Sequence, residues 1–397
     1  MTAPIVLTLN PGSSSIKLGL FSLEGDGPRR LAKGVIDLGR RPLVLELSDA
    51  GTTTDISIAA PVTDDLRGVI AEIFDRLVPL LGADAIAGVG HRVVHGGDGF
   101  AGCTLVTPAT LGQIEALVPL APLHQPQSVR LIRAIAHLRP DLPQAASFDT
   151  AFHRTQSDLV RRFALPHALF DQGIKRYGFH GLSYKSIAAQ LPRIAPGLAQ
   201  GRVVVAHLGS GASLCGLQGG ISRDTSMSFS TLDGIPMATR CGALDPGVIL
   251  HLVKEIGMTI EEVEDMLYHH SGLLGVSGIS ADSRSLIASG EPRAREALDL
   301  YTFRISREMA AIANTLGGVD GIVFTAGVGE HQPEVRQAVC NHLAWLGVQI
   351  DPAANVRHAT QIQAKASAVS VLVLPTDEEQ IIADEAVAVF RTELAGP

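Results

Sequence analysis

The sequence opens with two apolar stretches joined by a turn of small polar residues, in residues 5–22: IVLTLNPGSSSIKLGLFS. Residues 5–9 and the alternating stretch 16–23 are typical of β-strands. Between them, glycine and serine residues expose successive backbone N–H groups and hydroxyls, and Lys17 adds a positive charge. The turn is not a P-loop, because it continues into a strand instead of a helix. We interpret it as a phosphate cradle; an ordinary hairpin loop is the alternative that this stretch alone leaves open.

A second stretch repeats the arrangement in residues 202–217: RVVVAHLGSGASLCGL. A valine-rich strand again runs into a Gly/Ser turn, residues 208–213, and a second strand follows. The repeat makes an ordinary loop a poorer explanation of the first turn. It indicates a weak internal duplication whose halves meet near residue 150, and two such hairpins would contact a nucleotide from two sides.

Composition restricts the class of protein. The 397 residues are 46% hydrophobic and rich in glycine, which suits an α/β protein with a large core and either two domains or one elaborate domain. The net charge of -8 argues against nucleic-acid binding, which needs a basic surface. The cysteines are far apart and form no C-x-x-C pair, so neither disulfides nor a zinc ribbon is expected. No apolar run approaches the ~20 residues that span a bilayer, so we expect a cytoplasmic protein without a membrane partner.

Further elements can be placed from periodicity. Apolar residues recur at helical spacing in 63–81, and a strand is expected at 86–89. Helical patterns dominate from Pro246 onward and include a long helix, 292–316, that ends at a Gly-Gly pair. A final strand, 369–374, leads into a closing helix with Thr376 or Asp377 as its N-cap.

A third glycine-rich turn follows a buried strand, 321–325, and has the sequence AGVGE in residues 326–330. A turn between a strand and a helix is where a phosphate or nucleotide commonly binds. A plain connecting turn is the alternative. The dinucleotide-binding fingerprint is incomplete and lies late in the chain, so we do not expect a Rossmann dehydrogenase.

His91 and His95 have the spacing of a helical zinc pair, but the glycines that follow and the missing adjacent glutamate argue against a zincin helix. Arg92 is more informative, because a guanidinium at the end of a strand can hold a carboxylate or phosphate with two hydrogen bonds. A surface salt bridge is the alternative role for Arg92.

Three further ionisable residues lie among aromatic or small neighbours: Asp149, His180 and Arg240. Such surroundings perturb protonation and are typical of active-site pockets. Each also has a structural explanation. Asp149 could cap a helix, His180 could be a hydrogen-bonded core histidine, and Arg240 could be a solvated charge in its glycine-rich loop.

The order of these motifs resembles that of acetate kinases from end to end. The shared motifs are N-x-G-S-S-S-x-K, H-R-x-V-H-G-G, F-D-T-A-F-H, Y-G-F-H-G, H-L-G-x-G-A-S, T-R-x-G-x-x-D-P, a G-x-G-E turn and a terminal P-T-x-E-E. The resemblance implies a duplicated actin-like ATPase (ribonuclease H-like) fold around a central nucleotide cleft. It implies an N-terminal domain, residues 1–150, that the closing helix at about 376–397 rejoins, and a C-terminal domain, 151–375, that carries the nucleotide site and a homodimer interface.

The resemblance also implies the reaction, a reversible Mg²⁺-dependent transfer of phosphate from ATP to acetate that gives acetyl phosphate and ADP. Arg92 would bind the carboxylate, and Arg240 and His180 the phosphoryl oxygens in transfer. Asp149 would orient the acid or the water shell of the metal. Asn10 and Glu378 would be the protein groups nearest Mg²⁺, for which Mn²⁺ could substitute.

The remaining site residues come from the same resemblance. The acyl pocket would be formed by Val94, Leu123, Phe179 and Thr231. The residues that would hold the nucleotide are Lys17, His207, Leu208, Gly209, Ser210, Gly211, Asp282, Ser283, Arg284, Gly327, Val328, Gly329, Glu330 and His331.

Two of the nucleotide positions depart from the family pattern, and Thr231 stands where the family often has proline. Ser210 stands where the family commonly has Asn, and His331 follows Glu330 where the family commonly has Asn. We expect the first change to replace a direct amide contact by a hydroxyl or water contact. A propionate or butyrate kinase stays an alternative, because one methylene in an apolar pocket changes binding by only ~1–3 kcal/mol. A nucleotide-gated ATPase that needs no acid is a further alternative.

Overall fold

The computed structural model describes residues 4–12, 15–25, 27–49, 51–81 and 86–393. The chain forms two compact units, Met1–Phe152 with Asp377–Pro397 (unit 1) and His153–Thr376 (unit 2). The sequence analysis put the domain boundaries at 150 and 375. Within the described ranges, every helix is too short or too polar to span a lipid bilayer.

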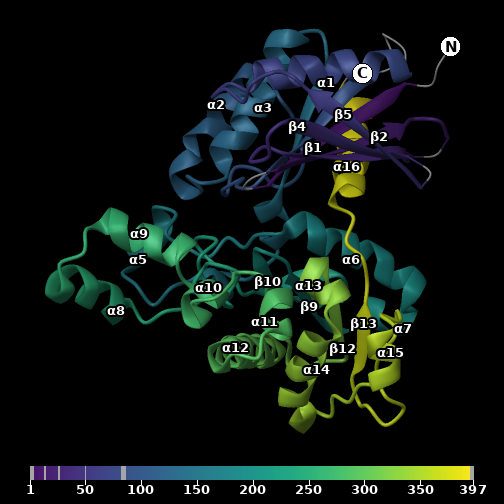
Figure 1. The fold of residues 1–397 in the computed structure, drawn as a ribbon. Coiled ribbons are helices and arrows are strands. Elements are labelled where there is room, and N and C mark those ends of the chain that lie inside the picture. The colour runs from purple at the N-terminus through teal and green to yellow at the C-terminus, as the bar shows by residue number, and fades with distance from the viewer. Residues whose placement is uncertain (1–3, 13–14, 26, 50, 82–85, 394–397) are drawn as a thin grey trace. The chain divides into compact units, whose positions relative to one another are not determined.

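Unit 1 is built on an eight-stranded sheet (Figure 1), whose order is β5-β4-β3-β2-β1-β6-β8-β7. Its strands are β1 Ile5–Pro11, β2 Ser15–Ser22, β3 Arg29–Asp37, β4 Leu43–Asp49, β5 Thr52–Ile58, β6 Ile86–Val93, β7 Thr104–Leu105 and β8 Gln144–Phe148. Its helices are α1 Arg67–Leu81, α2 Pro108–Ala116, α3 Gln125–Leu138 and α16 Glu378–Glu393.

Helices cover both faces of this sheet. Because side chains alternate along a strand, Ile5 and Leu7 of β1 enter the core formed with α1 and α3, and Val6 packs with Ala386 and Val387 of α16. The closing helix α16 therefore packs on the sheet of unit 1. Its N-cap is Asp377, whose Oδ1 accepts from the backbone N–H of Gln380 at 3.0 Å.

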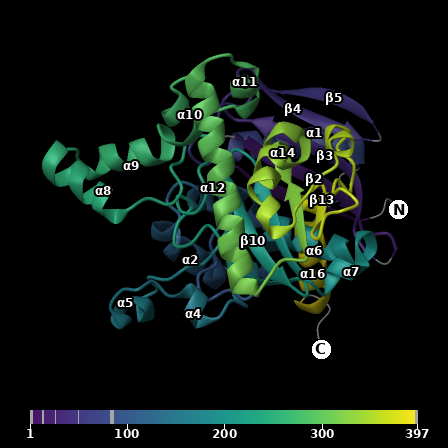
Figure 2. The same ribbon diagram turned by 90° about the horizontal axis from the view of Figure 1, so that it is seen from below.

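Unit 2 is built on a five-stranded sheet of order β11-β10-β9-β12-β13 (Figure 2). Its strands are β9 Arg202–Leu208, β10 Ala212–Gln218, β11 Ile221–Thr225, β12 Gly321–Thr325 and β13 Ser370–Val373. Its helices are α4 Asp158–Arg161, α5 His167–Asp171, α6 Gly181–Ile194, α7 Pro196–Ala199, α8 Pro246–His251, α9 Ile260–His269, α10 Gly272–Ser277, α11 Ser283–Ala288, α12 Pro292–Leu316, α13 Ala326–His331, α14 Pro333–His342 and α15 Pro352–Val356.

The two sheets share one topology, which confirms the predicted duplication. In unit 1, β3-β2-β1 are antiparallel neighbours, and β6 and β8 continue the sheet in parallel. In unit 2, β11-β10-β9 are antiparallel and β12 and β13 continue in parallel. The predicted Gly/Ser turns join the first two strands of each set, although Ser13 and Ser14 of the first turn lie outside the described residues.

Several element boundaries differ from the sequence prediction. The helix expected over 63–81 begins at Arg67, because Leu66 has a left-handed backbone with φ 55°. The strand expected over 86–89 continues to Val93. Its glycines suggest a turn, yet Gly88 and Gly90 pack directly under Phe390 and Ile382 of α16, where a side chain would not fit. The strand 321–325 and the helix 292–316 have the predicted bounds.

Candidate functional site

Arg92 is held in a defined orientation in unit 1. It lies near the end of β6, and β8 ends at Phe148 just before Asp149. Nε and Nη2 of Arg92 both donate to Oδ2 of Asp149, at 3.0 and 2.6 Å, and Nη1 donates to Oδ1 of Asn10 at 3.1 Å. The Asp149 side chain is almost fully buried, so Arg92 is not the surface salt bridge that the sequence left open. Because Nη2 has a second N–H, the fixed guanidinium can still donate to an anion.

Two glutamates at the start of α16 complete this cluster. Nδ2 of Asn10 donates to Oε2 of Glu378 and to Oε1 of Glu379, each at 2.8 Å. Burial opposes the charge of Arg92, but the carboxylates of Asp149 and Glu378 outweigh it and raise the pKa of Arg92 above its usual range. The guanidinium is therefore always charged, and the cluster combines one fixed cation with three carboxylates.

Lys17 and the described part of the first turn lie in the same unit. Lys17 is directly opposite Asn10 in the β1–β2 pairing, and its side chain is exposed. Lys17 and Asn10 therefore lie on the same pair of strands, β1 and β2.

His91 and His95 do not form a metal pair. His91 lies in the strand β6, where its Nε2 is 2.8 Å from the side-chain amide of Gln144, and Nδ1 of His95 accepts from the N–H of Gly97 at 3.0 Å. Burial lowers the pKa of each histidine to about 4. Among the described residues, no group of three or more His, Cys, Asp or Glu side chains could hold a metal ion.

Two stacked histidines lie beside the second Gly/Ser turn in unit 2, His207 in β9 and His180 just before α6. The rings of His180 and His207 stack with centroids 4.2 Å apart. Nδ1 of His180 lies 2.8 Å from Oγ of Ser213, and Nδ1 of His207 lies 2.8 Å from Oγ of Ser183. Each ring is thus held in place through its Nδ1 atom.

Arg240 and His180 meet above Gly211. A Cβ placed on Gly211 would lie 3.6 Å from Nε2 of His180 and 3.8 Å from Nη1 of Arg240. Nη1 of Arg240 also donates to the carbonyl of Thr231 at 3.2 Å, and the guanidinium lies near the ring of Tyr268. Burial lowers the pKa of Arg240 below its usual range. The two side chains therefore place two hydrogen-bond donors around a single point at the Gly/Ser turn.

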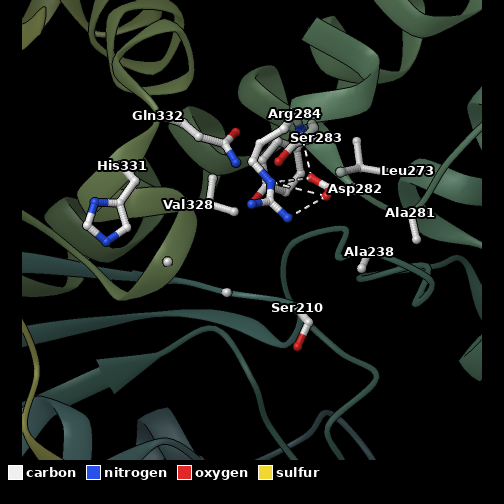
Figure 3. Close-up of a pocket in the computed structure, with 13 residues that line it drawn as sticks. Ser210, Ala238, Leu273, Ala281, Asp282, Ser283, Arg284, Val328, His331 and Gln332 are labelled. Carbon is white, nitrogen blue, oxygen red and sulfur yellow. Dashed lines mark hydrogen bonds and ion pairs between the residues drawn. The ribbon is translucent and has the colours of Figure 1, made fainter. Parts of the chain in front are cut away.

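Next to this turn, unit 2 contains a cavity of about 470 Å³ (Figure 3), within the usual range for a small-molecule site. Eight of the residues expected to hold a nucleotide line it: Gly209, Ser210, Asp282, Ser283, Arg284, Gly327, Val328 and His331. His207, Leu208, Gly211, Gly329 and Glu330 are outside this lining. Asp282 caps α11 and forms an ion pair with Arg284, with 2.7 Å between Oδ2 and Nη2.

The carboxylate of Glu330 accepts a backbone hydrogen bond within its own turn. Its Oε1 accepts from the N–H of Ala326 at 2.9 Å, at the start of its own short helix α13. The N–H of Ala326 at the start of this turn is therefore paired within the protein.

The sequence analysis missed two residues of this region. Gln332 lines the cavity and is 6% exposed. Arg336 is fully buried and donates from Nη1 to the carbonyls of Gly329 and Glu330, at 2.8 and 2.9 Å. It also donates from Nε to Oδ1 of Asn355 at 2.7 Å. Nothing in the local sequence distinguishes this arginine from a solvated helix residue.

The expected acyl-pocket residues come from both units. Val94 and Leu123 belong to unit 1, Phe179 and Thr231 to unit 2. Val94, Phe179 and Thr231 are buried, whereas Leu123 is 44% exposed. The hydrogen bond from Arg240 to the carbonyl of Thr231 places Thr231 near the second Gly/Ser turn.

Comparison with known proteins gives consistent matches. A model of the acetokinase family matches residues 5–384. An acetate kinase of Rhodopseudomonas palustris is 48% identical over 387 residues, which cover 96% of each chain. The crystal structure of Porphyromonas gingivalis acetate kinase has a TM-score of 0.85 at 35% identity and covers 98% of this chain and 100% of that chain. A propionate kinase from Francisella tularensis has a TM-score of 0.88 at 33% identity, covering 96% of this chain and 98% of that chain.

These matches extend over nearly the whole chain, and the solved structures share its two-sheet α/β fold. The motif order, the duplicated topology and the sequence identity therefore agree, and the chain belongs to the acetokinase family.

Proposed function

We propose that the protein is an acetate kinase, which transfers the terminal phosphate of ATP directly and reversibly to the carboxylate of acetate. The observation that carries the proposal is the arrangement of His180 and Arg240 around Gly211, together with the fixed guanidinium of Arg92. The 48% identity to an acetate kinase supports acetate as the acid.

The chemistry requires a carboxylate oxygen to attack the γ-phosphorus. A new O–P bond forms while the bond to the β-phosphate oxygen breaks, and ADP leaves with the electron pair; no proton has to move. Two unit charges at 4 Å repel by ~1 kcal/mol in water and by ~4 kcal/mol at an effective dielectric near 20. Catalysis therefore depends on alignment and on cationic groups that stabilise the transferring phosphoryl group.

The residues divide this work. Arg92 holds the acid carboxylate, and Asp149 and Asn10 fix the orientation of its guanidinium. His180 and Arg240 donate to the phosphoryl oxygens from the point above Gly211. The cavity lined by Asp282 and Val328 holds the adenosine. The proposal requires both units to act on one bound ATP.

The donor set at the start of α16 fits Mg²⁺. The ion prefers oxygen ligands, keeps most of its waters and takes only one or two protein groups. Glu378 supplies a carboxylate that Asn10 holds in place, and Glu379 is the neighbouring alternative. When bound, the metal neutralises charge on the phosphates; Mn²⁺ has similar ligand preferences.

We also propose a homodimer, because unit 2 exposes several large apolar side chains on one projecting arm formed by α8 and α9 (Figure 2). They are Val248 and Leu250 of α8, Ile260 of α9, Ile256 between these helices and Leu244 just before α8. Sedimentation of a monomer alone at micromolar concentration would contradict this. A cytoplasmic location fits the need for ATP and the four free cysteines; fractionation of the cells tests it.

The decisive experiment is to trap acyl phosphate as a hydroxamate from ATP and a panel of two-, three- and four-carbon acids. We expect the highest kcat/KM with acetate. A preference for propionate would keep the mechanism and change the substrate, as the similar propionate kinase structure makes worth testing. ATP hydrolysis that does not depend on an acid would instead favour a nucleotide-gated ATPase.

A further inference from the structure

The side-chain amide of Gln332 belongs to a buried residue at the cavity of unit 2. Gln332 is 6% exposed and lines the cavity (Figure 3). Its Oε1 is shielded from solvent, and no group among the residues that the structure describes donates to it. Buried amide oxygens in native proteins are nearly always hydrogen-bonded, so this atom calls for a donor from a ligand.

The backbone around Gln332 is fixed on both sides. Its N–H donates to the carbonyl of Val328 at 3.1 Å, and its carbonyl accepts from the N–H of Arg336 at 3.3 Å. The fully buried guanidinium of Arg336 also holds the carbonyls of Gly329 and Glu330 in the preceding turn. The backbone that carries this side chain is therefore held rigidly at the wall of the cavity, which favours a directional contact.

The cavity walls suit a purine. Val328 and Leu273 provide apolar surface, and the Asp282–Arg284 ion pair provides polar groups on the same lining. Of the two common purines, adenine presents a donor at N6 beside an acceptor at N7, and guanine presents two acceptors at O6 and N7. A glutamine amide, with one acceptor and one donor side by side, matches the adenine edge at both atoms and the guanine edge at only one.

We propose that Gln332 reads the N6 and N7 edge of adenine and thereby sets the preference of this enzyme for ATP over GTP. Its Oε1 accepts from the N6 amino group, and its Nε2 donates to N7. The inference rests on the proposed function for the nucleotide, but it concerns the choice of base and not the transfer step. His331, at the position where the family commonly has Asn, is exposed and leaves this role to its neighbour.

The test compares Gln332→Met, which keeps the length of the side chain and removes both hydrogen-bonding atoms, with wild type. Equilibrium binding of ADP and GDP is measured without acid, and kcat/KM is measured for ATP, GTP and 7-deaza-ATP. We expect wild type to prefer adenine at least tenfold. Gln332→Met should weaken adenine binding about tenfold, change guanine binding less than twofold, and leave kcat at saturating ATP within twofold. Wild type should lose several-fold in kcat/KM with 7-deaza-ATP, and the variant should not.

Gln337→Met is the matched control, because Gln337 lies on α14 and bonds only to Asn341. It should keep wild-type selectivity. An unchanged ADP/GDP ratio in Gln332→Met, or a wild type that does not discriminate, overturns the inference. The binding measurements separate this inference from the proposed function. Selective ADP binding that Gln332→Met abolishes supports the role of Gln332 even if no acid is phosphorylated. Absence of acid phosphorylation would refute only the proposed function.

Discussion

Oγ of Ser213 lies 2.8 Å from Nδ1 of His180, so the ring nitrogen of His180 that faces Gly211 is Nε2. Ser213 in turn contacts the hydroxyl of the buried Tyr184. When Tyr184 donates to Ser213 and Ser213 donates to Nδ1, the neutral imidazole carries its proton on Nε2 and can donate to a phosphoryl oxygen. Ser213 is thus a positioning residue for His180.

Ser213→Ala should therefore lower kcat about tenfold and leave the KM for ATP within twofold, because the ring loses the contact that selects its tautomer. The pH dependence of kcat should also change, which a purely structural defect would not cause. Steady-state kinetics from pH 5.5 to 8.5 measure both. Ser289→Ala, which removes a hydroxyl from a turn before α12, serves as the control. Identical pH profiles for Ser213→Ala and wild type would contradict this role.

Gly211→Ala tests the point between His180 and Arg240. The new methyl group would lie in ordinary contact distance of both side chains, 3.6 and 3.8 Å, so the fold should tolerate it. It would fill the space assigned to a phosphoryl oxygen, and we expect kcat to fall at least tenfold with a melting temperature within about 2 °C of wild type. Gly197→Ala, where an added Cβ meets nothing within 4 Å, should leave both unchanged. A fully active Gly211→Ala would remove the phosphoryl group from this position.

Arg92→Lys tests whether Arg92 binds the acid, in a variant that keeps the positive charge the fold needs. Lysine keeps a positive charge beside the buried carboxylate of Asp149, but it cannot bond Asp149 and Asn10 and also grip an anion as the guanidinium can. We expect the KM for acetate to rise roughly 10- to 100-fold, since hydrogen bonds to charged groups contribute about 1.5–3 kcal/mol each. ATP binding should stay nearly constant. Titrations with both substrates measure this; Arg133→Lys, at an exposed pair with Glu115, is the control.

By contrast, Arg92→Ala would leave Asp149 buried without its cation, which typically costs 3–5 kcal/mol of stability. Loss of activity in that variant would be hard to interpret alone. An unchanged acetate KM in Arg92→Lys would refute the assignment of Arg92 to the acid.

Glu378→Gln tests the metal position. The glutamine oxygen can still accept from Nδ2 of Asn10, so the local hydrogen bond is kept and only the charge is lost. We expect the Mg²⁺ concentration for half-maximal activity to rise about tenfold, because Mg²⁺ favours anionic oxygen ligands. Glu379→Gln should have the smaller effect. If the metal titration of Glu378→Gln matches wild type, Glu378 does not contact the ion.

The sequence predicted those features that depend on local chemistry. Both Gly/Ser hairpins, the helix 292–316 and the strand 321–325 follow from turn residues and periodicity over short windows. The extension of β6 beyond Val89, through Gly90 to Val93, was not predicted, because Gly90 packs against α16, almost 300 residues later in the chain. The strands β3, β4 and β5 were not predicted either.

The site residues divide in the same way. Arg92, Asp149 and His180 stand out by their motifs, and their contacts with Asn10 and Ser213 appear only in the structure. Gln332 and Arg336 carry no local signal. Their importance comes from burial beside a turn that other segments, including α15, complete.

The buried histidines should make stability depend on pH. Burial lowers the pKa of His91 to about 4, against about 6.5 in an unfolded chain. The unfolded state therefore binds more protons between these values, so the stabilising contribution is present above pH 6.5 and is lost as the pH falls toward 4. For His91 this loss between pH 7 and pH 5 is about 2 kcal/mol, and His95 and His153 act in the same direction.

In urea unfolding followed by circular dichroism, His91→Gln should reduce the pH-dependent loss of stability by about that amount. His137→Gln, at an exposed position on α3, should lose as much stability as wild type. Equal losses in His91→Gln and wild type would show that His91 does not become protonated on unfolding in this range.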